Sequence, residues 1–208
     1  MSILALTSNT LTSPAAAGNI EYTSPIFAAT PISTERGIVP TQQYYRLESA
    51  VVGANATGAQ SIFGVGVTLS ASTVYEFELG FVLSKSAGTT ANTLGLGFAG
   101  TATLNNILYS CSGVAITSST SGASIGSAYG SVSITASNLN TNMSTTNAAL
   151  SWAVLIKGTV SINAGGTFIP QYTLSAAPGG AYSTVAGSFI RIAPVSASGS
   201  NTSVGAWA

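Results

Sequence analysis

The sequence predicts an all-β protein, an antiparallel, jelly-roll-like β-sandwich preceded by an extended N-terminal arm. Three observations predict it. Apolar and polar residues alternate with period two over several stretches, most clearly over residues 74–83, as in strands with one buried face. Segments rich in Gly, Ser, Thr and Asn separate the stretches at intervals of about ten to fifteen residues. No stretch has both the apolar spacing and the length of a stable helix.

Residues 1–43 form the predicted arm. The apolar pattern is weak there, and four of the seven prolines of the chain interrupt it too often for a helix or a long strand: Pro14, Pro25, Pro31 and Pro40. Two short strand pieces are expected, at residues 19–22 and 25–29. Five of the ten charged residues lie between residues 21 and 48, so half of the charge gathers on the arm and its junction with the rest of the chain.

Residues 44–208 form the predicted sandwich. In the stretch Val74–Leu83 the aromatic and leucine side chains share one face, which is expected to be buried. The same alternation marks Trp152–Val160 and Phe168–Leu174. The last of these contains Pro170, which favours an edge strand because proline lacks the N–H of the ladder.

Seven further strands complete the expected sandwich, at residues 44–52, 60–69, 93–99, 107–117, 128–136, 189–195 and 202–207. Two low-complexity stretches, residues 118–127 and 137–147, consist almost entirely of Ser, Thr, Asn, Gly and Ala. We expect both to be exposed loops at the ends of the sandwich.

The composition favours a building or binding protein over an enzyme. Five Glu balance five Lys and Arg in 208 residues, and the chain contains neither His nor Asp, which carry much of general acid–base catalysis and metal ligation. A neutral surface gives no electrostatic attraction for nucleic acid or an anionic membrane, and it permits close packing of copies. We therefore expect no cofactor, no nucleic-acid partner and no membrane partner.

No catalytic or metal-binding residue is assigned. Glu76 and Glu78 share a strand face at a spacing of about 6.8 Å, within the range of some catalytic carboxylate pairs. We interpret them instead as a solvated face or a partner contact. Cys111 is the single cysteine, and we expect it to be a small buried side chain. A Ca²⁺ ion held by loop carbonyls stays open as an alternative.

The arm and the C-terminus supply the candidate contact residues. Glu35-Arg36-Gly37 is interpreted as a turn with an ion pair that leads into a strand at Ile38-Val39-Pro40. This turn could lock the arm to a neighbouring subunit. A tryptophan beside the C-terminus needs a place to be buried, either under its own sheet or on an adjacent subunit. The predicted assembly contacts are Glu21, Tyr22, Phe27, Glu35, Arg36, Val39 and Trp207.

Several strings in the arm resemble a segment of tailed-bacteriophage virion structural proteins. They are Gly18-Asn19-Ile20-Glu21-Tyr22, then Phe27, Thr30-Pro31 and Arg36-Gly37-Ile38-Val39-Pro40. The strand at residues 74–83 and the final Gly-Ala-Trp-Ala are similar more loosely. The resemblance implies a virion location after synthesis in the host cytoplasm, and it leaves open which virion protein this is.

Two functions fit these observations. The first is a capsid decoration, or cement, protein that forms a homotrimer on the shell and clamps adjacent capsomers of the major capsid protein. The alternative is a tail-fibre or receptor-binding module, whose loops at 118–127 and 137–147 would contact a host surface glycan. The short chain favours the first, because a fibre normally carries a stalk and an attachment domain.

Overall fold

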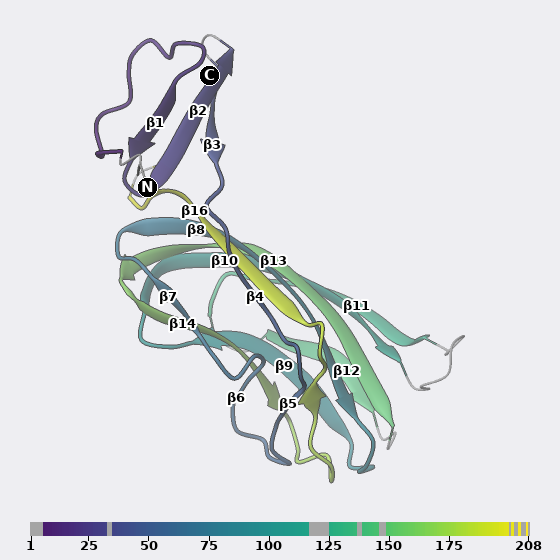
Figure 1. The fold of residues 1–208 in the computed structure, drawn as a ribbon. Coiled ribbons are helices and arrows are strands. Elements are labelled where there is room, and N and C mark those ends of the chain that lie inside the picture. The colour runs from purple at the N-terminus through teal and green to yellow at the C-terminus, as the bar shows by residue number, and fades with distance from the viewer. Residues whose placement is uncertain are drawn as a thin grey trace.

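The computed structural model describes residues 6–32, 35–116, 125–136, 139–145 and 149–199, with Asn201, Val204 and Trp207; for residues 125–129 and 139–145 the description covers the backbone. Over this part of the chain there are sixteen strands and no helix, so the all-β prediction is confirmed. Two layers of sheet form a sandwich, and a small third sheet lies beyond one end of it (Figure 1).

Eight strands of the sandwich follow the jelly-roll order. They are β7 (Val67–Leu69), β8 (Thr73–Lys85), β9 (Asn92–Ala99), β10 (Thr103–Ile116), β11 (Ile125–Ser133), β12 (Leu139–Thr145), β13 (Leu150–Ala164) and β14 (Gly166–Leu174). The antiparallel pairs are β10 with β11, β9 with β12, β8 with β13 and β7 with β14. This is one long antiparallel ribbon rolled into two sheets, with orders β8-β13-β10-β11 and β7-β14-β9-β12, which is the jelly-roll topology.

Five more strands extend the two sheets: β4 (Gln43–Arg46), β5 (Val51–Val52), β6 (Gln60–Ser61), β15 (Ser183–Thr184) and β16 (Phe189–Ala197). Strand β16 pairs with β8, and β4 pairs with β16, so the larger sheet runs β11-β10-β13-β8-β16-β4. The strand predicted over residues 60–69 is broken into β6 and β7. Gly64, at a φ of 71°, lies in the break, where a residue with a Cβ would be strained.

The apolar side chains of the predicted alternation are the buried ones. On β8 the side chains of Tyr75, Phe77 and Leu79 are at most 4% exposed, as predicted for this face. The centre of the sandwich is an aromatic cluster in which Phe98 stacks on Phe168 with ring centroids 4.6 Å apart, while Phe77 and Tyr109 meet Phe98 edge-on. These packed rings hold the two sheets together.

The prediction that Pro170 marks an edge strand is wrong. Strand β14 pairs with β9 on one side and with β6 and β7 on the other. The carbonyl of Pro170 accepts a hydrogen bond from the backbone N–H of Ile62, between those two short strands. Because N and O of one residue point to the same side of an antiparallel strand, the missing N–H falls where the neighbouring strand is interrupted.

The prediction of a loop at 137–147 is also wrong, because residues 139–145 form β12 and pair with β9. A polar composition does not prevent pairing where a neighbouring strand offers free backbone groups. The other loop prediction, at 118–127, lies largely outside the described residues, and residues 125–127 belong to β11. Of the strand predicted at 202–207, only Val204 and Trp207 are described, and neither is in a strand.

The N-terminal segment folds into a small sheet of its own. It contains β1 (Ile20–Thr23), β2 (Ile26–Ile32) and β3 (Glu35–Val39) in the order β1-β2-β3. The two predicted strand pieces correspond to β1 and β2, and β3 begins at Glu35, where a turn leading into a strand is predicted. The chain then enters the sandwich as β4, and a cleft of about 660 Å³, lined by Tyr22, Pro25 and Tyr75 among others, lies between the three-stranded sheet and the sandwich.

Candidate functional site

The three-stranded sheet has two unlike faces, because successive residues of a strand point to opposite sides. The register aligns Tyr22, Phe27 and Val39 across the three strands. The next row on the same side contains Ile20, Ala29 and Gly37. These six residues form what we call the open face, and the opposite side is the covered face.

The covered face is packed beneath the segment that precedes β1. Ile26, Ala28 and Thr30 of β2 are at most 5% exposed. The segment is held by backbone hydrogen bonds at both ends, from Asn9 N–H to the Tyr22 carbonyl and from Gly18 N–H to the Thr30 carbonyl. One face of this small sheet is therefore satisfied within the chain.

An ionic cluster fixes the segment over the covered face. Glu21 on β1 and Arg36 on β3 form an ion pair at 2.9 Å. The Glu21 carboxylate also accepts hydrogen bonds from the backbone N–H and the hydroxyl of Thr12, at 2.7 and 2.8 Å, and Arg36 donates to the Thr12 carbonyl at 2.6 Å. The bonds from Thr12, with the nearby guanidinium, hold the pKa of Glu21 below its ordinary value.

The interpretation of Glu35-Arg36-Gly37 as a turn with its own ion pair is wrong. All three residues lie in β3, and the side chains of Glu35 and Arg36 point to opposite faces as neighbours in a strand do. The partner of Arg36 is Glu21. Glu35 is exposed at the start of the strand.

The open face is apolar and in large part exposed, and its Tyr22 borders the cleft next to the sandwich. Ile20 is 68% exposed and Val39 is 40% exposed, while Tyr22 and Phe27 are half-buried and stack on each other with centroids 4.7 Å apart. None of its six residues carries a charge. A contiguous apolar patch that stays exposed among the described residues is a candidate contact site for another molecule.

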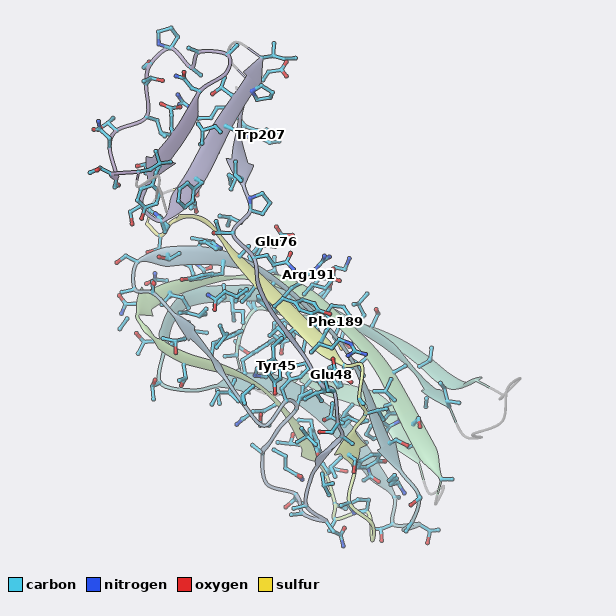
Figure 2. The ribbon with its side chains drawn as sticks, in the orientation of Figure 1. Tyr45, Glu48, Glu76, Phe189, Arg191 and Trp207 are labelled. Atoms are coloured by element: carbon cyan, nitrogen blue, oxygen red, sulfur yellow. The ribbon has the colours of Figure 1, made fainter. Side chains whose placement is uncertain are left out.

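Trp207 is 78% exposed, and its indole N–H donates to the carbonyl of Val204 at 2.9 Å. It lies at the end of the molecule that carries the three-stranded sheet (Figure 2). The alternative in which this ring is buried under its own sheet is therefore wrong. Contact with an adjacent subunit stays a prediction for it.

The structure thus separates the predicted contact residues into groups. Tyr22, Phe27 and Val39 share the open face, Glu21 and Arg36 organise the covered face, and Glu35 and Trp207 stand apart in solvent. Sequence reasoning missed Ile20, the most exposed member of the open face. Its spacing of two from Tyr22 in a strand was the signal that could have found it.

The carboxylates on β8 behave as a solvent face. Glu78 lies between Lys157 of β13 and Arg191 of β16, and its carboxylate is 2.9 Å from the charged nitrogen of each. Hydrogen bonds from Lys157 and then Arg191 hold the pKa of Glu78 below its ordinary value. Glu78 is thus kept ionised, whereas the general acid of a glycosidase pair needs a raised pKa.

The described residues show no sign of a metal site or of a membrane-spanning helix. They hold no cluster of three or more His, Cys, Asp or Glu side chains that could bind a metal ion, and none of their elements is a helix able to cross a membrane. Cys111 is buried at 2% exposure on β10, as predicted.

Comparison with known proteins adds little. No protein family matches the chain, and no curated protein does. Among solved structures, the structure of the infectious bursal disease virus Gx strain aligns at 8% identity with a TM-score of 0.20, covering 87% of this chain and 44% of that chain. The chain thus spans less than half of the matched chain, and a likeness of this size carries no argument about fold or function.

Proposed function

We propose that this protein is a structural protein of a virus particle, and specifically a capsid decoration protein of the tailed-bacteriophage kind. In this proposal the sandwich is the rigid body and the three-stranded sheet is the contact element. The observation that carries the proposal is the open face, where Ile20 and Val39 stand exposed beside the stacked pair of Tyr22 and Phe27. The resemblance of this same segment to virion proteins supports it.

The proposed mechanism is binding without catalysis. The open face packs on a neighbouring shell subunit, where burial of apolar surface provides the driving force. The ionic cluster of Glu21, Arg36 and Thr12 keeps the sheet in one shape, so that little ordering is needed when it binds. Each bound copy then stabilises the assembled shell over free subunits by mass action.

The finer features of the proposal are a homotrimer and a clamp across adjacent capsomers of the major capsid protein. The alternative, a receptor-binding module of a tail fibre, depends on residues 118–127 and 137–147 as glycan-binding loops. Much of the second stretch is strand β12, and no described feature favours a glycan site there. We therefore propose the decoration role.

A pair of variants matched for exposure tests the proposal. Ile20→Glu places a charge on the open face, and Val52→Glu places one on an equally exposed apolar site of the sandwich, 73% exposed against 68% for Ile20. Each variant is mixed with virus shells that lack the protein, and bound protein is measured after the shells are sedimented. We expect wild type and Val52→Glu to sediment with the shells and Ile20→Glu to remain in solution. Equal binding of Ile20→Glu would contradict the proposal.

Where the protein binds separates the two virion roles. Electron microscopy of particles carrying the labelled wild-type chain should show it spread over the shell. Label confined to the tail would instead support the fibre alternative.

A further inference from the structure

The outward side of the larger sheet is a second surface, and the pairing register fixes its layout. One row across β13, β8 and β16 reads Lys157, Glu78, Arg191. The row on one side of it reads Leu155, Gly80, Phe189, and the row on the other side reads Thr159, Glu76, Ala193. We call these nine residues, with the adjoining Leu108, Ser110 and Ser112 of β10, the outer face. Glu76, Arg191 and Phe189 follow one another along it (Figure 2).

The outer face holds four of the ten charged residues of the chain, and their charges sum to zero. Glu78 is bridged by Lys157 and Arg191. Glu76 is exposed one row away, and no lysine or arginine among the described residues forms a salt bridge with it. Both cations keep a large exposed fraction, 59% for the side chain of Lys157 and 47% for that of Arg191. Each can therefore form an ion pair with a second carboxylate.

The outer face also has projecting side chains and a groove. Leu155 and Leu108 project from it, 38% and 51% exposed. Between Leu155 and β16 lies an open groove of about 750 Å³, lined by Gly80, Leu155 and Phe189 among others. The ring of Phe189 packs directly against Gly80, because a Cβ there would stand only 2.9 Å from it. The face therefore carries both knobs and a hollow.

A two-fold axis that runs between β8 and β13, nearly parallel to them, makes this face complementary to itself. Such an axis exchanges the positions of β8 and β13 while keeping each row opposite the same row. Lys157 of one copy then lies over Glu78 of the second copy, and the reverse holds by symmetry. In the next row, Leu155 of each copy lies over Gly80 of the other, at the groove beside the Phe189 ring.

The remaining positions agree with this placement. The exchange also brings β10 over β16, so that Leu108 faces Ala193 and Phe189 faces Ser112, and each pair sets a large side chain against a small one. Glu76 comes next to the Lys157 of the second copy, one row away. Sheets that pack face to face keep their strands within about 30° of each other, which an axis close to the strand direction allows.

We propose that two copies of this chain pack through the outer face about this two-fold axis, with Lys157 of each copy paired to Glu78 of the other. The inference does not depend on the proposed role in a virus particle, which rests on the three-stranded sheet. A closed trimer has no two-fold axis between its subunits. The expected species is therefore a dimer, or a hexamer of two trimers where the trimer also forms.

A charge-swap pair of full-length variants tests the inference. Lys157→Glu alone places Glu opposite Glu78 of the partner, and Glu78→Lys alone places Lys opposite Lys157. Each variant should therefore be deficient in self-association. When the two are mixed, position 157 of either chain meets the opposite charge at position 78 of the other, so a mixed dimer should form.

The readout is mass by light scattering after size-exclusion chromatography, with one variant carrying a tag that shifts its mass. We expect wild type to form the dimer or hexamer, each single variant to dissociate at least tenfold more readily, and the mixture to recover the wild-type mass with both chains present. Thr57→Glu places a charge in the exposed loop between β5 and β6, outside the outer face and the predicted assembly contacts, and should associate as wild type does. Recovery in the mixture also shows that both variants are folded.

Three results would overturn the inference. They are a wild-type chain that is a monomer or only a trimer at every concentration tested, single variants that associate like wild type, or a mixture that does not recover. None of these concerns the open face, so the sedimentation test with Ile20→Glu stays independent.

Discussion

The sandwich and the three-stranded sheet differ in how they shield an apolar sheet face from water. Each sheet of the sandwich buries its apolar face against the other, around Phe98 and Phe168. The three-stranded sheet has no second sheet, so a loop covers one side and the other side stays open, with Ile20 68% exposed. The comparison teaches that the sandwich closes its apolar core within the chain, whereas the small sheet leaves one apolar face exposed.

The largest expected contrast is between two phenylalanines. Phe98→Ala removes the centre of the aromatic cluster and should lower the free energy of unfolding of the sandwich by about 3–5 kcal/mol. Phe27→Ala on the open face should change it far less, because that ring is already half-buried at the surface. Thermal or denaturant unfolding followed by tryptophan fluorescence measures both. Similar losses for the two variants would erase the proposed difference between the regions.

A smaller contrast should appear between two adjacent alanines of β2. Ala28 is fully buried under the covering segment, and Ala29 is on the open face. Ala28→Leu overfills its site and should destabilise the small sheet by about 1–3 kcal/mol, whereas Ala29→Leu should be tolerated. Hydrogen exchange of the β2 amides reports this locally. If the two substitutions accelerate exchange equally, the assignment of covered and open faces is wrong.

Loss of the ionic cluster should have a more local effect. Arg36→Met keeps most of the side-chain stem but removes the charge that holds Glu21 and the Thr12 carbonyl. We expect faster proteolysis within residues 6–19 and an unchanged melting temperature for the sandwich. Arg46→Met is the matched control, since Arg46 pairs with Glu48 at an exposed site, where ion pairs contribute little. Equal protection of residues 6–19 in both variants would exclude an organising role for Arg36.

The smallest expected effect is a pH dependence. The folded-state pKa of Glu21 lies below the ordinary value of 4.5, so its contribution is complete above pH 4.5 and is lost as the pH falls through the folded-state pKa. The amide proton of Thr12, which bonds to this carboxylate, should shift in NMR spectra with a midpoint below pH 4.5. A midpoint at or above 4.5 would show that the Thr12–Arg36 cluster does not hold the carboxylate in solution.

Much of the fold could be predicted, because alternation is a local property that a single sequence displays. The buried face of β8 followed directly from the spacing of Tyr75, Phe77 and Leu79. Pro170 and residues 139–145 were misjudged because their place depends on which strands pair beside them. Pro170 lies opposite the break between β6 and β7, so its missing N–H falls where the neighbouring strand is interrupted. The polar residues 139–145 form a strand because the edge of β9 is free to pair with them.

The candidate site was predictable only in part. The spacing within β1 and within β2 predicts which side of its own strand Tyr22 or Phe27 occupies. It does not predict that the two rings lie next to each other, because that depends on the register between the strands. The pairing of Arg36 with Glu21 joins two strands of a sheet that was expected to be an arm. No pattern in the sequence shows that Thr12 completes this cluster, because a loop conformation decides it.

The central claim is that the open face of the three-stranded sheet is where this protein meets its neighbours in a virus particle. A cryo-electron microscopy reconstruction of particles that carry the protein tests this most directly. We predict density of another subunit packed on Ile20, Tyr22 and Val39. A reconstruction in which these side chains face solvent while the protein is held by another surface would contradict the claim.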